Sequence, residues 1–389
     1  MKIKGFLGSA LASGIKKHKK DLALIYSEKP AIVAGTFTQN RIKAAPVNLT
    51  KRRIKSGWAQ AIIINSGNAN ACTGKQGNTD ARLMSKWAAK ALDIPERLVL
   101  VASTGIIGKL LPMEKIKQTI PSLVKDLNQS AWRDVACAIM TTDAFPKLGF
   151  AKAKVNNIPF SILGIAKGAG MIMPQMATML AFFITDIAIS QEVLKQTFKK
   201  VVSKTFNRIS IDGDTSTNDM ALIFANGSAK NSPLHTETPI FSEALLKVAT
   251  KLSKMIVKGG EGASKLIEIC IKGSPNTEVA ENIARAVVNS PLVKTAIYGE
   301  DPNWGRLLAA IGKSRAKIKH QKIDIYFDKI CLVKNGCGLG KTSEKQAKVY
   351  LRRKEIKIII DLNQGNREIT WYTCDLTPEY VQINAAYHT

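Results

Sequence analysis

Apolar side chains recur at intervals of three and four residues in three stretches of the chain, and this spacing predicts amphipathic helices. The first stretch follows Ser190, a good N-capping residue, and its apolar stripe is Leu194, Phe198, Val201 and Val202. The second begins at Phe241 and ends before Gly259 and Gly260, with the stripe Leu245, Ala249, Leu252 and Ile256. The third follows Thr277, with the stripe Val279, Ile283, Ala286 and Val287. Each helix needs a partner for its apolar face.

Short runs of β-branched residues predict the strands against which these helices pack. The clearest runs are Ala61 to Ile64, Leu266 to Ile271, Ile323 to Phe327 and Ile356 to Leu362. Strands and helices come in blocks rather than in strict alternation, and no stretch of the sequence repeats. The pattern therefore predicts an α/β chain of the α+β kind, in which helices cover layers of mixed β-sheet, rather than a doubly wound parallel sheet.

The size and composition are typical of a globular protein. The chain has 389 residues, of which 45% are hydrophobic and 22% charged, which is enough for a substantial core. No run of about 18 apolar residues is present, which excludes a membrane-spanning helix, and the glycine-broken N-terminus fits a signal peptide poorly. Six cysteines without a C-x-x-C pair and four widely separated histidines lead us to expect reduced thiols, a cytoplasmic location and no metal site.

The net charge of +27 is the outlier in the composition, and it raises the question of a nucleic-acid partner. Lysines and arginines are spread along the chain, and the densest run, Lys16 to Lys20, lacks the interleaved aromatic residues of a single-strand binding groove. We therefore favour a lysine-rich solvated surface over a nucleic-acid-binding protein, and we expect neither a nucleic acid nor a membrane as partner.

Six segments rich in Gly, Asn, Ser and Thr lie between the apolar stretches. They are N-S-G-N-A-N-A-C-T-G (65–74), S-T-G-I-I-G (103–108), T-T-D-A-F-P-K (141–147), D-G-D-T-S-T-N-D (212–219), K-G-G-E-G-A-S-K (258–265) and G-E-D-P-N-W-G-R (299–306). Surface turns are the plain alternative to a binding site for each of them. A P-loop, a G-x-G-x-x-G fingerprint and a G-x-S-x-G nucleophile elbow are all missing from the sequence, so these segments need another chemistry.

The run K-G-A-G-M-I-M-P-Q-M-A-T-M-L (167–180) places one threonine, Thr178, behind a turn rich in glycine and proline. A threonine hydroxyl is a weak nucleophile and needs a base. The α-amino group of the same residue can act as this base once the preceding peptide bond is cut, because its pKa of about 8 is close to working pH. The small Ala177 leaves the carbonyl before Thr178 accessible to attack. A buried, hydrogen-bonded structural threonine is the alternative.

The same run resembles the self-cleavage segment of the ornithine acetyltransferases, the bifunctional glutamate N-acetyltransferases of arginine biosynthesis. The six polar segments and the terminal I-N-A-A-Y-H-T (383–389) are similar to that family's other signature segments and come in the same order. The resemblance covers nearly the whole chain, from the K-G-F at Lys4 to Thr389. Gln175, Ala144 and Ser264 depart from residues that are common in the family.

The resemblance implies self-cleavage between Ala177 and Thr178. The implied cut gives an α chain of residues 1–177 and a β chain of residues 178–389, which together form one globular unit. The implied architecture is the αββα arrangement of N-terminal-nucleophile-like enzymes, and the implied assembly is a heterotetramer of two α and two β chains.

The activity implied by the resemblance is transfer of the acetyl group from N2-acetylornithine to glutamate through an acetyl-Thr178 intermediate. Thr104 and Gly105 correspond to the oxyanion hole. The implied substrate contacts are Thr142 (with Thr141 as the alternative), Lys167, Thr178, Glu261, Asn384 and Thr389. We expect no cofactor and no metal. Whether acetyl-CoA is a second donor is left open, because members of the family differ in this.

Two other functions compete with acetyl transfer. A self-processing aminopeptidase or amidase would share the N-terminal nucleophile but pass the acyl group to water, and a basic nucleic-acid-binding protein would not cleave itself. The segments outside the cleavage site favour acetyl transfer.

Overall fold

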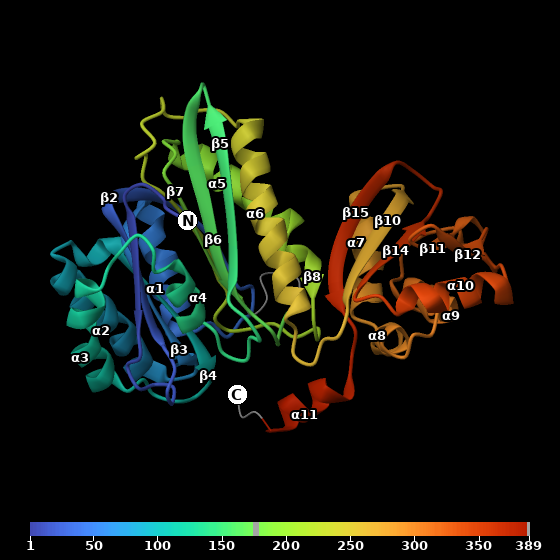
Figure 1. Ribbon diagram of the computed structural model, residues 1–389, viewed down its shortest axis with the longest axis horizontal. Helices are drawn as coiled ribbons and strands as arrows, with labels where there is room; N and C mark the ends of the chain where they lie inside the picture. Colours follow the sequence, from blue (N-terminus) through green and yellow to red (C-terminus); the bar gives the residue numbers. More distant parts are fainter. Residues whose placement is uncertain (174–178, 387–389) are drawn as a thin grey trace. The chain divides into compact units, whose positions relative to one another are not determined.

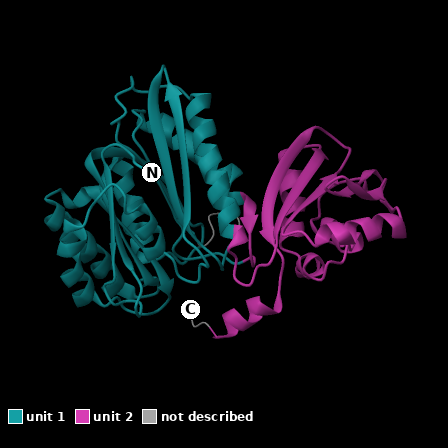
Figure 2. Cartoon of the chain, in the orientation of Figure 1, with its two compact units in different colours: residues 1–207, 214–256, 388–389 teal, residues 208–213, 257–387 magenta. Residues whose placement is uncertain are grey.

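The computed structural model describes residues 1–173 and 179–386 (Figure 1). The chain divides into two compact units (Figure 2). Unit 1 comprises Met1–Asn207, Asp214–Ile256 and His388–Thr389, and unit 2 comprises Arg208–Gly213 and Val257–Tyr387. The predicted cleavage point therefore lies within unit 1 and does not coincide with the boundary between the units.

The described part of unit 1 is built on an eight-stranded mixed sheet in the order β4-β3-β2-β9-β7-β6-β5, with β1 paired to β2. The strands are β1 (Phe6–Leu11), β2 (Leu22–Phe37), β3 (Trp58–Asn68), β4 (Val99–Ile106), β5 (Lys147–Val155), β6 (Ile158–Lys167), β7 (Leu180–Thr185) and β9 (Met220–Ala225). The pairs β3–β4 and β7–β9 are parallel, whereas β2–β9, β6–β7 and β5–β6 are antiparallel.

Helices cover this sheet because alternate strand residues face opposite sides. The helices are α1 (Ala45–Arg53), α2 (Gly74–Leu92), α3 (Met113–Lys125), α4 (Trp132–Ala138), α5 (Gln191–Lys204) and α6 (Pro239–Lys258). Leu24 and Ile63 pack in one buried cluster with residues of α2 and α3. Their neighbours Ile25 and Ile64 face the other way and join a cluster that contains Trp132 of α4.

In the sheet of unit 1, two strands that follow the predicted cleavage point lie between strands that precede it. β7 and β9 come after residue 178, yet they lie between β2 and β6, which come before it. Hydrogen bonds join β9 to β2 and β7 to β6 along their lengths. A cut between residues 177 and 178 would therefore leave the two chains held together by the sheet itself.

Unit 2 has a seven-stranded sheet in its described residues, in the order β13-β12-β11-β14-β10-β15-β8. The strands are β8 (Ile209–Ser210), β10 (Leu266–Ser274), β11 (Asp324–Phe327), β12 (Ile330–Lys334), β13 (Cys337–Gly338), β14 (Glu355–Asp361) and β15 (Arg367–Cys374). The helices are α7 (Thr277–Val288), α8 (Pro291–Tyr298), α9 (Trp304–Lys313), α10 (Lys341–Leu351) and α11 (Pro378–Ala386). The core packs α7 and α9 against isoleucines of β10 and β14. Short 3-10 turns occupy Ile54–Ser56, Glu96–Leu98, Phe206–Arg208 and His320–Lys322.

The predicted fold class, mixed sheets covered by helices, is confirmed, and so are the elements on which it rested. The helix after Ser190 is α5, and the Ser190 side chain accepts a hydrogen bond from the Val193 N–H. The helix at Phe241 is α6, and the four predicted strands lie in β3, β10, β11 and β14. The third helix is α7, but its buried stripe includes Ala280 and Ala284 and leaves Ala286 only half-buried, so the predicted face was slightly rotated.

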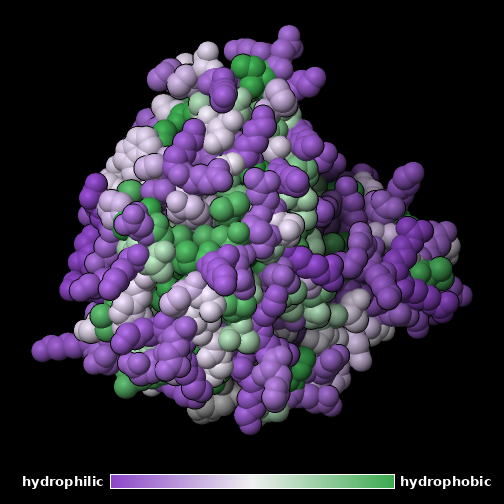
Figure 3. All heavy atoms as spheres, turned by 60° about the vertical axis from the view of Figure 1, so that its left-hand side comes forward, coloured by the Kyte–Doolittle hydropathy of each residue, from purple (hydrophilic) through white to green (hydrophobic). Residues whose placement is uncertain are grey.

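Charged and polar side chains dominate the face shown in Figure 3, with an apolar area between them. They belong to a chain with 57 lysines and arginines against 30 acidic residues. No helix in the described residues is both long and apolar enough to cross a membrane.

Candidate active site

Three of the six polar segments converge in unit 1 around Asn218. The Asn218 side-chain amide donates hydrogen bonds to the carbonyl oxygens of Ala69, at 2.6 Å, and Ser103, at 2.8 Å. The Ser103 hydroxyl donates to the Asn65 side chain at 2.6 Å. All these side chains are buried, so the bonds replace lost contacts with water and fix the three segments relative to one another. They are parts of one constructed site rather than separate surface turns.

Gly105 lies where β3 and β4 run side by side. It has φ +133°, and a Cβ at this position would lie 2.3 Å from the carbonyl carbon of Gly67. Only glycine tolerates that conformation together with so close a backbone neighbour. The S-T-G segment is thereby pressed against the N-S-G-N segment, and Thr104, next to Gly105, is buried.

The carboxylate of Asp143 organises a second part of this site. Its Oδ1 accepts hydrogen bonds from Lys147 Nζ at 2.5 Å and from the Gly168 N–H at 2.7 Å. Its Oδ2 accepts from the Thr141 N–H at 3.0 Å. The side chains of Asp143 and Lys147 are both fully buried. The T-T-D-A-F-P-K segment is therefore tied to the end of β6, where Lys167 lies.

Lys167 connects these two parts. Its buried ammonium group donates to the Thr104 hydroxyl oxygen at 3.3 Å. A hydroxyl that accepts from an ammonium group turns its own hydrogen elsewhere, so the Thr104 hydroxyl is free to act as a donor to a ligand. A positively charged group behind it strengthens that donor.

Burial alone would raise the pKa of Asp143, but the ammonium groups of Lys167 and Lys147 and the Gly168 N–H outweigh that effect and lower the pKa below its ordinary value. Asp143 is therefore ionised at neutral pH. A permanent carboxylate between two lysines keeps both in place and offsets much of the cost of burying them.

Lys16 is a further lysine of this region, and in the sequence it stands out only as part of a basic run. Its Nζ donates to the carbonyl oxygens of Met140, at 3.0 Å, and Ala138, at 3.4 Å. Burial, which is only partly opposed by Asp21, lowers the pKa of Lys16 from 10.5 to about 8. The charges of Asp143 and Lys167 also act on it, so its electrostatic environment is that of the site.

This shift predicts an unusual reactivity. In a brief pulse with a water-soluble N-hydroxysuccinimide ester, labelling of Lys16 should reach half its maximum at a pH of about 8. An ordinary exposed lysine does so at about 10.4, because only the neutral amine reacts. Peptide mass spectrometry across pH measures each midpoint. A Lys16 midpoint equal to that of the exposed lysines would contradict the assignment.

Met179, the residue before β7, makes hydrogen bonds through both polar groups of its backbone. The Met179 N–H donates to Asp219 Oδ1 at 2.8 Å, and the Met179 carbonyl accepts from the Met220 N–H at 3.2 Å. Lys167, at the end of β6, pairs with Leu180 across the sheet. Lys167 and Thr104 therefore lie beside the first residues of β7, immediately after position 178 in the sequence.

Two predicted substrate residues meet in unit 2. The Asn384 side-chain amide of α11 donates to Glu261 Oε2 at 2.9 Å. The loop that carries Glu261 is fixed to the segment before α11, since Thr377 donates to the Gly262 carbonyl at 2.7 Å and the Lys265 N–H donates to Asp375 at 2.9 Å. Ser264, a departure from the family pattern, also hydrogen-bonds to Asp375.

The sixth polar segment (299–306) caps a helix and borders a hollow. Asn303 is the N-cap of α9 and accepts from the Arg306 N–H. The Trp304 indole N–H donates to Glu344 at 3.0 Å. The hollow beside it has a volume of about 570 Å³ and is lined by Trp304, Lys341, Lys345 and Lys348 among others.

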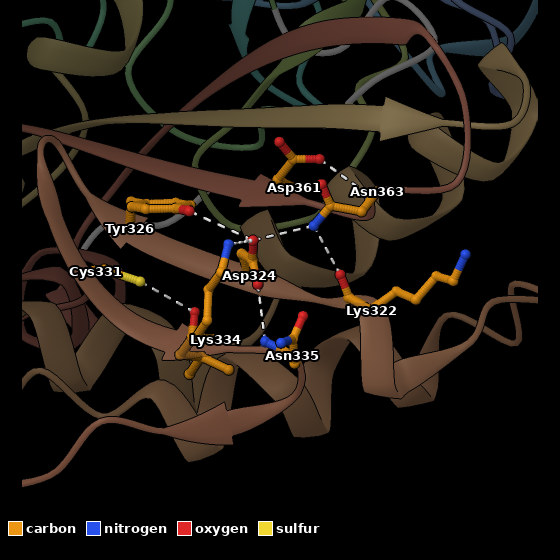
Figure 4. A network of polar contacts seen from close by, with 9 residues as sticks. Lys322, Asp324, Tyr326, Cys331, Lys334, Asn335, Asp361 and Asn363 are labelled. Atoms are coloured by element: carbon orange, nitrogen blue, oxygen red, sulfur yellow. Dashed lines mark hydrogen bonds and ion pairs between the residues drawn. The ribbon is translucent and has the colours of Figure 1, made fainter.

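A further polar network in unit 2, centred on Asp324, is structural (Figure 4). Asp324 accepts from Lys334 Nζ at 2.6 Å, the Asn335 N–H at 2.8 Å and the Asn363 side chain at 3.1 Å. Burial would raise the pKa of Asp324, but these bonds outweigh it and lower the pKa. With both oxygens satisfied, the carboxylate ties the β11–β12 hairpin to the loop after β14.

The described structure thus brings together Thr104, Gly105 and Lys167 in unit 1, and Glu261 with Asn384 in unit 2. Thr142 is half-buried beside Asp143, while its alternative Thr141 contacts Asp143 through its N–H. Ala177, Thr178 and Thr389 lie outside the described residues, and all these site assignments stay predictions. Sequence reasoning missed Lys16, Asp143, Lys147, Asn218 and Asp219 as individuals, although the last four lie in segments that it had marked. In the described parts of the chain, no three His, Cys, Asp or Glu side chains gather as metal ligands.

Comparison with known proteins identifies the family of the chain. The model of the ArgJ family matches residues 8–389. The arginine biosynthesis bifunctional protein ArgJ of Syntrophotalea carbinolica is 47% identical, and that of Geobacter sulfurreducens is 46% identical. In both cases 100% of each chain is covered. A crystal structure of the protein of that name from Bacillus halodurans is 42% identical with a TM-score of 0.50, covering 52% of this chain and 96% of its own. The chain therefore belongs to the ArgJ family.

Proposed function

We propose that this chain transfers the acetyl group of N2-acetylornithine to glutamate, through an acetyl group carried on Thr178, in arginine biosynthesis. The family assignment supports the pathway. The observation that supports the chemistry is the hydrogen bond from Lys167 to Thr104, the neighbour of Gly105, because Lys167 pairs with Leu180, two residues after Thr178. An acyl-transfer site needs donors that face the carbonyl oxygen as it becomes negative.

In the proposed first step, Thr178 attacks the acetyl carbonyl and ornithine leaves. The Thr104 hydroxyl and the Gly105 N–H stabilise the oxyanion, and Lys167 orients the hydroxyl by donating to its oxygen. Glutamate then attacks the acetyl-enzyme by the reverse route, giving N-acetylglutamate. Dividing the transfer into two acyl exchanges avoids direct attack of one amino acid on the other.

Self-cleavage between Ala177 and Thr178 supplies the free amine that serves as base. The position of the downstream strands β9 and β7 between upstream strands supports this proposal, because the sheet would hold the α chain (1–177) and the β chain (178–389) together. The match to the Bacillus halodurans structure covers 96% of that chain and 52% of this one, which fits a separate chain of about half this length. We further propose an assembly of two α and two β chains.

The proposed substrate contacts are Lys167, Thr142, Glu261, Asn384 and Thr389, besides Thr178 itself. Lys167 suits the α-carboxylate of either amino acid, and the Glu261–Asn384 pair offers a carboxylate and an amide for an ammonium group. The proposed reaction needs no bound cofactor and no metal. If acetyl-CoA is a second acetyl donor, it would act as a co-substrate, and we propose a cytoplasmic location.

The proposal is tested by incubating the purified protein with N2-acetylornithine and glutamate and measuring ornithine and N-acetylglutamate. We expect ping-pong kinetics, shown by parallel double-reciprocal lines, and equal amounts of the two products. Release of acetate from N2-acetylornithine at an undiminished rate without glutamate would instead identify an amidase. Replacing N2-acetylornithine with acetyl-CoA in a second assay, with glutamate still present, decides the donor question.

Replacing Lys167 with methionine tests the carboxylate assignment. Loss of a hydrogen bond to a charged group should raise the KM for N2-acetylornithine by about 10- to 100-fold. The kcat should also fall, since Lys167 orients Thr104. Lys154→Met, which removes an exposed lysine of β5, is the matched control for the loss of one charge. An unchanged KM in Lys167→Met would refute the assignment.

A further inference from the structure

Asp219 is a buried carboxyl group that the mechanism above does not use. It is 1% exposed and ends the D-G-D-T-S-T-N-D segment, one residue before β9. Its Oδ1 accepts from the Met179 N–H at 2.8 Å, while its Oδ2 is buried without a hydrogen-bond partner among the described residues. A buried polar atom without a partner is uncommon and costly, so it calls for an explanation.

The position of Asp219 links it to the proposed nucleophile through one residue. Met179 is bonded through its N–H to Asp219 and through its carbonyl to Met220, so residues 219 and 220 fix both polar groups of its backbone. Asn218, the preceding residue, holds the segments of Ala69 and Ser103. Only the α-carbon and carbonyl carbon of Thr178 separate its α-nitrogen from the Met179 nitrogen that Asp219 binds.

The charge state of Asp219 matters at this position. Burial raises the pKa of Asp219 well above its ordinary value, against the opposing effects of the Met179 N–H, Lys167 and the Ser216 N–H. The carboxyl group is therefore favoured in its neutral form. A negative charge here would stabilise the ammonium form of the nearby Thr178 amine and deprive the reaction of its base.

We propose that Asp219 is a positioning residue for the reaction at Thr178: as an uncharged acid it holds Met179, and with it the start of the downstream chain, without placing a negative charge beside the Thr178 amine. This inference rests on the proposed function. It explains why an acid can occupy so buried a position, and it assigns a task to the last residue of a segment that otherwise serves only to connect others.

The test compares Asp219→Asn and Asp219→Ala with the parent. Asparagine keeps the acceptor oxygen and cannot ionise, so self-cleavage and kcat at neutral pH should stay within about threefold of the parent. Alanine leaves the Met179 N–H unbonded and should lower kcat about tenfold or more through misplacement. The parent should lose activity as the pH rises through the raised pKa of Asp219, and Asp219→Asn should lack that loss. Lys16 and Lys167 are common to both proteins, so the difference isolates Asp219.

Asp186 provides the matched control. It is a buried aspartate at the other end of β7, where it accepts from the Ser161 N–H at 2.7 Å. Asp186→Asn should keep the same loss of activity with rising pH as the parent. The same loss of activity with rising pH in Asp219→Asn as in the parent, or an Asp219→Ala protein with the kcat of Asp219→Asn, would overturn the inference.

Thermal stability across pH gives a readout that does not depend on activity. An acid whose pKa is raised on folding contributes stability at low pH, and that contribution is lost as pH rises from the ordinary value toward the raised one. The Tm of Asp219→Asn relative to the parent should therefore rise over this range. If the parent transfers no acetyl group, the proposed function fails. Independently of that result, a Tm difference between Asp219→Asn and the parent that stays constant with pH would show that Asp219 is not held neutral.

Discussion

The Thr178→Ala protein is expected to remain one uncut chain and to transfer no acetyl group. Both results have one cause, because the hydroxyl that would cut the Ala177–Thr178 bond is also the acceptor of the acetyl group. Removing a nucleophile that acts together with its base typically costs a factor of about 10⁴ or more. Intact-mass measurement of the denatured protein reports the cut, and the acetyl-transfer assay reports the activity.

Two further variants make this result specific. Thr178→Ser keeps a hydroxyl and an amine, so it should still be cut and remain active. Thr79→Ala removes an exposed threonine of α2 in the same unit and should behave as the parent. Two chains with the 177/178 cut in Thr178→Ala would show that another group or a protease makes the cut.

Thr104→Val should lower kcat by about 10²- to 10³-fold, the usual loss for one oxyanion-hole donor. Valine has nearly the shape of threonine, so the buried packing at this position is kept while the hydroxyl is lost. The structure supports a donor role because Lys167 already donates to the Thr104 oxygen at 3.3 Å, which leaves the hydroxyl hydrogen for the ligand. The KM should change much less than kcat, since the donor acts mainly in the transition state.

Ser103→Ala is the control for this change, one residue earlier in the same strand. The Ser103 hydroxyl donates to Asn65 and takes no part in the contact with Lys167. Its loss should lower the free energy of unfolding by about 1–3 kcal/mol and leave kcat nearly unchanged in the folded protein. Equal losses of kcat in the two variants, measured at saturating substrate, would mean that Thr104 is structural.

Local sequence patterns predicted the elements whose signals are local. Ser190 predicted the start of α5, because a serine side chain accepts a hydrogen bond from a free N–H at the beginning of a helix. Gly259 and Gly260 predicted the end of α6. The isoleucine runs of β10 and β14 were evident for the same reason. The slight rotation of the α7 face shows the limit, since Ala286 and its neighbours Ala280 and Ala284 are too alike in hydropathy to define a face by themselves.

The site was predicted as segments rather than as contacts. Nothing local in the sequence tells that Asn218 reaches Ala69 and Ser103, or that Lys16 reaches the carbonyl of Met140, because these pairs lie more than a hundred residues apart in the chain. The Asp143–Lys147 pair was visible at four-residue spacing, but its burial depends on the surrounding fold. The raised pKa of Asp219 likewise follows from burial, which no short motif reports.

The account is tested most directly by trapping the acetyl-enzyme. The protein is mixed briefly with N2-acetylornithine in the absence of glutamate, quenched in acid and measured by intact-mass and peptide mass spectrometry. We predict two chains, with one acetyl group on the N-terminal residue of the chain that begins at Thr178, an unmodified α chain, and removal of the acetyl group when glutamate is added before the quench. Two chains that release ornithine while neither ever carries an acetyl group would contradict the proposed intermediate.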